Sequence, residues 1–118
     1  MKKKVLVPIV VLLALAIPLV LLTSKVEDSV LEKTYLSNLH SYNHEIIETK
    51  TDKELLDLAY MTCKSLSEGW DSEQALLDVF SLEDVKTDST FIYAAIIVSD
   101  SVKVFCPQFQ DQIEEWVY

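Results

Sequence analysis

Two histidines come closest to forming a metal site in this sequence. His40 and His44 are four residues apart, and Glu48 follows four residues later. On one continuous helix these side chains would share a face, and two imidazoles on one face can hold zinc or copper. Position 41 is serine, whereas zinc proteases carry a glutamate there, and the chain has no third histidine. We interpret the pair as solvated side chains and keep zinc or copper binding through His40 and His44 as the alternative function.

The two cysteines, Cys63 and Cys106, are the second candidates for chemistry. A redox-active dithiol usually has C-x-x-C spacing, which places a resolving thiol beside the reactive one, and these two are far apart in the sequence. In an exported segment, an even number of cysteines forms disulfides by default. We predict a Cys63–Cys106 disulfide that stabilises the fold by about 4 kcal/mol in the chain-entropy model. In a reducing compartment both would instead be free, buried thiols.

No arrangement typical of an enzyme is present. No serine lies in a G-x-S-x-G setting, and the single glycine, Gly69, is too few for a phosphate or dinucleotide loop. Adjacent carboxylates such as Glu83 and Asp84 are typical of solvated surfaces. We therefore expect no catalytic residues, no resident metal, no cofactor and no enzymatic activity.

The N-terminus has the pattern of an export signal. Three lysines, residues 2–4, precede the uncharged run "VLVPIVVLLALAIPLVLL" over residues 5–22. As a helix this run would be about 27 Å long, close to the hydrocarbon thickness, whereas a cleaved signal needs only about 7–15 apolar residues. Ala14 and Ala16 also form an A-x-A cleavage site. We predict a signal anchor or signal peptide over residues 1–23, prefer the anchor, and place the lysines in the cytoplasm.

Charge is divided between this leader and the rest of the chain. All 19 acidic residues follow Ser24, and the whole chain has a net charge of −9. The sequence contains no arginine, which removes the bidentate phosphate and base contacts of nucleic-acid binding. We expect no nucleic-acid partner. High charge keeping a small exported domain soluble is preferred to a basic partner or bound divalent cations.

Helix start signals divide the remaining sequence. Capping boxes begin at Ser24, Thr51 and Asp71, and the second is followed by apolar residues at helical spacing up to Gly69, a typical C-terminal residue. Residues 24–50 are predicted to form a first helix or a stalk, broken within "HSYNHEIIETKTD". The third box begins a short helix that ends near "SLEDVK".

The longest apolar segment, "STFIYAAIIVSDSVKVFC", is ambiguous. Its β-branched residues and the alternation of Ile92, Ala94, Ile96 and Val98 suit a strand. A helical face is formed by Phe91, Ala95, Val98, Val102 and Phe105. The segment is too long for a typical strand and has no strong strand to pair with, so we predict a helix that begins at Thr87 and Asp88.

The "Cys106-Pro107" step marks where this helix ends. Proline lacks an N–H and disfavours helical backbone in the residue before it, but it starts helices well. Phe109, Ile113 and Trp116 then share the face of a short terminal helix. For the final "EEWVY", packing on the core is preferred to binding a partner.

Two stretches of the sequence that contain the cysteines resemble a known family. "LAYMTCKSLSEGWDSEQALLDVF" followed by "FIYAAIIVSDSVKVFCPQF" resembles a family of short exported bacterial domains, numbered 732 among the domains of unknown function and known mainly from actinobacteria. The matching residues are Cys63, Gly69, Ala94, Ala95, Phe105, Cys106 and Pro107, and the resemblance covers roughly residues 52–110. It implies a small secreted α-helical domain with one disulfide and no assigned activity.

Together the sequence predicts an all-α bundle of four or five short helices with one disulfide, preceded by a transmembrane or signal helix. The domains are a leader over residues 1–23, a stalk or first helix over 24–50, and a disulfide-stapled domain over 51–118. We expect a structural or protein-interaction module of the cell envelope. The protein is either held in the cell membrane by a single pass, with its C-terminal domain outside the cytoplasm, or secreted. Its expected partners are the membrane and an envelope protein.

Overall fold

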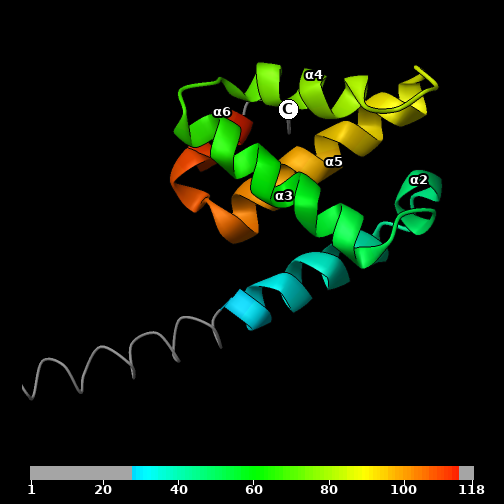
Figure 1. Cartoon of the computed structure of the whole chain (residues 1–118), viewed down its shortest axis with the longest axis horizontal. Coiled ribbons are helices and arrows are strands. Elements are labelled where there is room, and N and C mark those ends of the chain that lie inside the picture. Colours follow the sequence, from blue (N-terminus) through cyan, green and yellow to red (C-terminus); the bar gives the residue numbers. More distant parts are fainter. Residues whose placement is uncertain (1–27, 115–118) are drawn as a thin grey trace, which may run out of the picture. The chain divides into compact units, whose positions relative to one another are not determined.

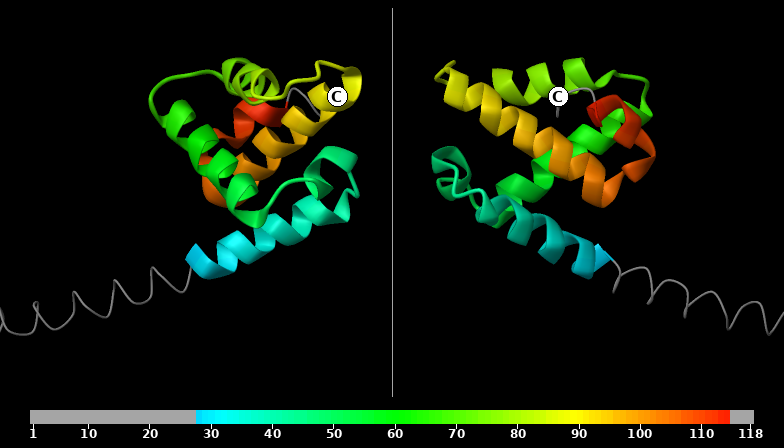
Figure 2. Two further views of the ribbon diagram at one scale, coloured as in Figure 1. Left: turned by 45° about the vertical axis from the view of Figure 1, so that its right-hand side comes forward. Right: turned by 180° about the vertical axis from the view of Figure 1, so that it is seen from behind.

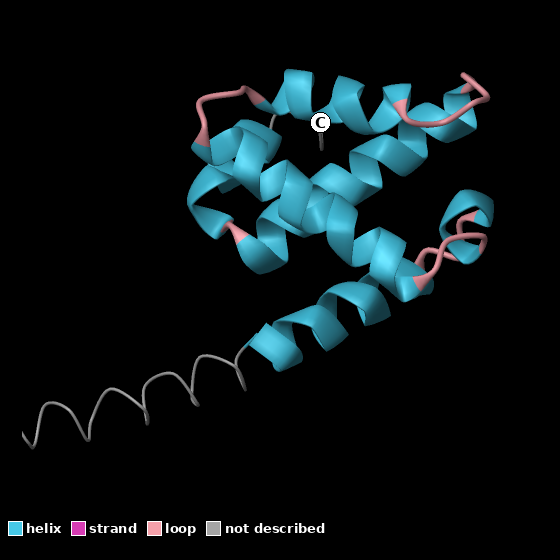
Figure 3. Cartoon of the chain, viewed as in Figure 1, coloured by secondary structure: helices cyan, strands magenta, loops and turns pink. Residues whose placement is uncertain are grey.

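The computed structural model describes residues 28–114, and residues from Leu31 onward form one compact unit. Every regular element in the described range is a helix, so the predicted all-α class is confirmed there (Figure 3). The predicted leader and the capping box at Ser24 lie outside the described residues. Among residues 28–114, no helix is both long enough and apolar enough to cross a membrane.

The helices follow one another with short connections (Figure 1). A first helix over residues 28–41 is followed by α2 (Glu45–Glu48), α3 (Asp52–Ser67), α4 (Ser72–Ser81), α5 (Asp88–Phe105), the 3₁₀ turn η1 (Pro107–Phe109) and α6 (Gln110–Glu114). The described range thus holds six α-helical segments where four or five were predicted. The difference comes from α2, a helix of only four residues inside the predicted break.

Three helices begin where the sequence indicates. Thr51 Oγ1 accepts a hydrogen bond from the Glu54 N–H at 3.1 Å, and Glu54 Oε1 accepts one from the Thr51 N–H at 3.0 Å. Asp71 and Gln74 form the same reciprocal pair at the start of α4. Thr87 is the N-cap of α5. These bonds satisfy N–H groups that a helix N-terminus leaves unpaired, which confirms the three predicted starts.

Two helix ends are also confirmed. Gly69 has a φ of +102°, and the N–H groups of Gly69 and Trp70 donate to the carbonyls of Leu66 and Ser65, each at 3.1 Å. This is the Schellman arrangement, in which glycine tolerates the positive φ. At the other end of the domain α5 stops at Phe105, and Pro107 begins η1.

The core surrounds α5, which packs against α2, α3, α4, η1 and α6 (Figure 2). The most buried residues of α5 include Tyr93, Ala94, Ile97, Val98 and Val102. The predicted face is therefore only partly right, because Phe91 is 48% exposed and Ala95 and Phe105 are half-buried. A helix enclosed by neighbours on several sides buries a wider arc than one periodic stripe indicates.

The first described helix contributes to this core. Tyr35 and Leu39 are completely buried, and the Tyr35 hydroxyl donates to the Leu55 carbonyl oxygen in α3 at 2.8 Å. The Tyr35 ring also meets the Phe105 ring edge-on, with centroids 5.4 Å apart. Residues 31–41 thus pack against both α3 and α5 instead of standing apart from them.

Candidate functional site

The predicted disulfide is present and joins two helix ends. Cys63 lies in the last two turns of α3, and Cys106 is the residue that follows α5. Their Cα atoms are 5.9 Å apart, within the range of roughly 4.4–6.8 Å that disulfides need. The bond spans 43 positions of sequence and leaves no free cysteine. It crosslinks the two longest helices of the unit, as the sequence predicted.

Pro107 determines the position of Cys106. Pro107 prevents α5 from continuing, so Cys106 takes an extended φ of −142° while its N–H still bonds to the Val102 carbonyl. The Cys106 side chain, only 3% exposed, thereby turns inward toward α3. The Cys-Pro step thus positions the buried half of a structural bond whose other half, Cys63, is half-buried.

The two histidines do not share a helix. The first helix ends at residue 41, and Asn43 has a φ of +52°, a left-handed conformation that asparagine tolerates better than most residues. His44 is then the N-cap of α2. The single face that His40, His44 and Glu48 would share on one continuous helix does not form, because the helix ends within the segment where the sequence predicted a break.

Each histidine has its own partners. His44 Nδ1 accepts from the Ile46 N–H at 3.2 Å, which leaves Nε2 to donate to the Ser89 carbonyl oxygen at 3.1 Å. His40 lies 3.2 Å from the Glu48 carboxylate and 3.6 Å from that of Asp52. The hydrogen bond to Glu48 is the main reason that the pKa of His40 is raised above its ordinary value.

Their role is to fix chain segments. His44 joins the start of α2 to α5, and His40 ties the first helix to α2 and α3. In residues 28–114, no three histidine, cysteine or acidic side chains gather closely enough to hold a metal ion.

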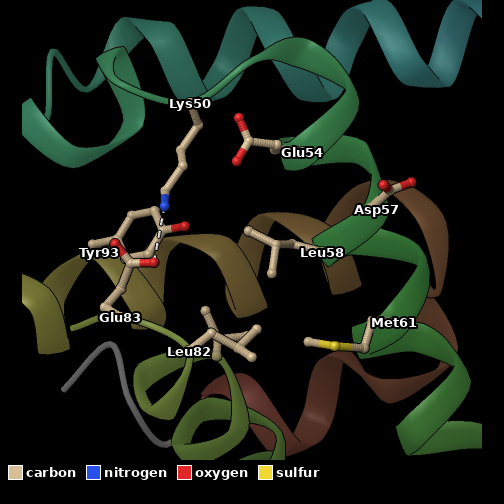
Figure 4. Close-up of a pocket in the computed structure, with 9 residues that line it drawn as sticks. Lys50, Glu54, Asp57, Leu58, Met61, Leu82, Glu83 and Tyr93 are labelled. Carbon is tan, nitrogen blue, oxygen red and sulfur yellow. Dashed lines mark hydrogen bonds and ion pairs between the residues drawn. The ribbon is translucent and has the colours of Figure 1, made fainter.

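A hollow of about 360 Å³ lies between α3, the end of α4 and the start of α5 (Figure 4). Leu58, Met61, Val79 and Leu82 line its apolar part. Its polar part consists of Lys50, Glu54, Asp57, Glu83 and Tyr93. In Figure 4 the Lys50 and Glu83 side chains meet beside the Tyr93 ring.

The charged groups of this hollow are already paired. Lys50 Nζ lies 2.9 Å from Glu83 Oε2, and both side chains are about four-fifths buried, with 21% and 19% exposed. Glu54 accepts from the Thr51 N–H, and Asp57 pairs with Lys53 at 3.0 Å. The Lys50–Glu83 pair links the loop before α3 to the loop after α4, so it holds two connections together.

Tyr93 also lines the hollow, and its phenol group is neutral. Its side chain is only 1% exposed. Burial, followed by the charges of Glu83 and Glu54, raises the pKa of Tyr93 well above its ordinary value. The phenol therefore stays protonated and cannot act as a base at neutral pH.

A single buried carboxylate lies elsewhere in α5. Asp100 is 4% exposed, and its Oδ2 atom has no hydrogen-bond partner among the described residues. Burial is the main cause that raises its pKa, and the charge of Lys103 opposes the shift. A buried carboxylate with an unbonded oxygen costs stability when it is ionised, so we expect this residue to weaken the fold at neutral pH.

No direct sequence signal predicts the Lys50–Glu83 pair, because its two members are distant along the chain. The sequence does contain a signal that Asp100 is buried. It lies seven positions after Tyr93 and three after Ile97, on the same buried arc of α5. An acidic residue in phase with an apolar face indicates burial.

Comparisons with known proteins identify a family. No curated protein and no solved structure gives a significant match. A family model described as Protein of unknown function (DUF732) matches residues 31–108. The match starts earlier than the resemblance seen around the cysteines and takes in the first described helix, with its buried Tyr35 and Leu39. The chain belongs to this family of proteins of unknown function.

Proposed function

We propose that this protein is an extracytoplasmic module of the cell envelope that serves a structural or protein-interaction role and has no catalytic one. The observation that carries the proposal is the Cys63–Cys106 disulfide. Structural disulfides persist in oxidising compartments and are rare in the cytosol of mesophiles. The lysine-led apolar run over residues 5–22, which lies outside the described residues, supplies the export signal.

Two further features support a non-catalytic role. The polar side chains of the hollow in Figure 4 are engaged in ion pairs and a helix cap, and Tyr93 is held neutral. Large apolar side chains are 40% or more exposed at Tyr42, Tyr60, Trp70, Leu77, Leu82, Val85, Phe91 and Ile92. Among these residues, Leu82 and Val85 lie close together in the sequence after α4, and neighbouring exposed apolar side chains favour contact with another macromolecule.

The compartment is tested by the intact mass of the protein from its host after alkylation of free thiols without reductant. We expect no alkyl groups on the native protein, and two after reduction and unfolding as the control. A retained leader indicates a membrane tether, and a shortened chain indicates secretion. Two alkyl groups on the native protein would contradict the extracytoplasmic proposal.

The interaction role is tested by photo-crosslinking in living cells. A photoreactive residue replaces Leu82 or Val85, the two most exposed of these apolar side chains, and exposed Lys64 serves as the control site. We expect one discrete adduct with an envelope protein from positions 82 and 85 and none from position 64. Adducts absent from all three positions, or equal at all three, would contradict an interaction through this surface.

A further inference from the structure

A second hollow opens between α4 and α5 on a different part of the surface. It has a volume of about 360 Å³ and is lined by Glu73, Leu76 and Leu77 of α4 and by Phe91 and Ala95 of α5. Leu77 and Phe91 are 50% and 48% exposed. Its volume is at the lower end of the roughly 300–1,000 Å³ of small-molecule pockets, so it suits one aromatic side chain better than a large ligand.

Helices α4 and α5 come together near their connection. The rings of Phe80 and Phe91 meet there with centroids 6.1 Å apart. From this point the two helices diverge, and α6 lies on the side where they are farther apart (Figures 1 and 2). A chain that continues from α6 therefore starts on this side of the helix pair.

Hydrogen bonds fix α6 at the start of α4. Gln112 accepts from the Ser72 N–H through Oε1 at 3.0 Å, and its carbonyl oxygen accepts from the Ser72 hydroxyl at 3.1 Å. Ile113 is buried against the core, with 1% exposed. Gln112, two residues before Glu114, is thus held at Ser72, which directly precedes Glu73 of the hollow.

From this geometry we infer that the hollow is the seat of the chain's own terminal segment, with Trp116 as the side chain that enters it. Trp116 lies two residues beyond Glu114, a backbone span of up to ~7 Å when extended, to which its long side chain adds reach, and Leu77 lies about 7.5 Å along α4 from Ser72. The segment contains Trp116, Val117 and Tyr118. An apolar segment tethered within reach has a high effective concentration at the hollow.

The chemistry of the hollow matches an indole. The hollow is lined by the apolar and aromatic side chains of Leu76, Leu77, Phe91 and Ala95, and Glu73 is the only charged residue among the described ones that line it. A buried tryptophan usually requires an acceptor for its N–H, and a glutamate such as Glu73 on the wall of the hollow carries acceptor oxygens. Docking would remove the indole and the exposed surfaces of Leu77 and Phe91 from water. This is favourable because apolar area is buried.

The test uses the full-length chain at one copy per lipid nanodisc, so that a second copy cannot fill the hollow. Trp70→Phe leaves Trp116 as the only tryptophan of this chain, and a tryptophan-free scaffold protein keeps the signal specific. We expect blue-shifted emission and acrylamide quenching about 3-fold weaker than for N-acetyltryptophanamide. Emission and quenching equal to the free indole compound would overturn the inference.

Two matched variants show whether the hollow provides this shielding. Leu77→Glu adds a negative charge inside the hollow, and Leu82→Glu adds the same charge at a similarly exposed leucine outside it. We expect Leu77→Glu to raise the quenching of Trp116 close to that of the free indole compound and Leu82→Glu to leave it unchanged. Shielding that survives Leu77→Glu would place Trp116 elsewhere, against lipid or another face, and would also overturn the inference.

Discussion

The two ends of α5 are held in different ways. At its C-terminal end the disulfide joins Cys106 to α3, and the ring of Phe105 packs on Tyr35. At its N-terminal end no covalent bond is present among the described residues, and polar contacts, including the hydrogen bond from His44 to the Ser89 carbonyl oxygen, add to the ring contact of Phe80 with Phe91. Nearby, Lys50 and Glu83 bridge the loops before α3 and after α4. One end is closed by a covalent bond and the other by several weak interactions, so their contributions to stability should differ in size and in pH dependence.

The largest effect should come from the covalent end. We expect the Cys63→Ala/Cys106→Ala double variant to lose about 4 kcal/mol, because the disulfide no longer restricts the unfolded chain. This is comparable to the whole stability of a small domain, so the variant should be mostly unfolded. Pulse proteolysis in urea of the full-length chain in lipid vesicles measures the change.

Reduction of the native protein is the control for this variant, because it breaks the same bond without changing the sequence. Both treatments should lower the urea midpoint by similar amounts. A variant as stable as the native protein would show that apolar packing alone holds this end of α5.

At the polar end, the Lys50–Glu83 pair should have the largest effect. We expect Lys50→Met to cost about 1–2 kcal/mol, because it leaves the Glu83 carboxylate mostly buried without its cation. The pair of Lys53 and Asp57 is the matched control, since its side chains are 85% and 64% exposed. Lys53→Met should cost about 0.3 kcal/mol or less.

A double-mutant cycle with Glu83→Gln isolates the interaction within the Lys50–Glu83 pair. The same urea measurement provides the four values. Equal costs for Lys50→Met and Lys53→Met would mean that the polar end depends on its apolar neighbours and not on this pair.

Asp100 lies in the half of α5 that the disulfide anchors, but unlike the disulfide it is expected to lower the stability of the fold. Because burial raises its folded pKa above that of the unfolded chain, the unfolded state releases its proton first as the pH rises. Stability is therefore highest below the unfolded pKa and falls as the pH rises through the folded pKa. We expect Asp100→Asn to stabilise the protein by about 1 kcal/mol at pH 7 and to have little effect at acidic pH.

Urea midpoints at neutral and acidic pH measure this difference. Asp111→Asn, an exposed acidic residue in α6, is the control for the removal of one charge. A destabilising effect of Asp100→Asn at pH 7 would show that the carboxylate has a favourable partner there.

The smallest effect is expected at His40. Its raised pKa means that its contribution is fully present below the unfolded pKa of about 6.5 and is lost as the pH rises through the folded pKa. His40→Gln should remove this pH dependence, at a cost of about 0.3 kcal/mol in acid, because the ring is well exposed and its ion pairs are screened. An NMR titration of the imidazole measures the pKa directly, and Glu48→Gln should lower it.

The sequence by itself determined the local features of this protein. The capping residues Thr51, Asp71 and Thr87, the positive φ at Gly69 and the stop at Pro107 act within one or two turns of chain, so their residue types are sufficient. The disulfide was predictable for a simpler reason, since Cys63 and Cys106 are the only two cysteines. The helical class followed from these signals together.

Only the tertiary structure decided which residues meet across the bundle. Asn43 turns the chain between the two histidines, and the packing of several helices around α5 leaves Phe91 half-exposed while it buries Asp100. The Lys50–Glu83 contact joins positions 33 residues apart. Such contacts depend on how helices cross, and that geometry is set by the summed packing of many side chains, which no local pattern encodes.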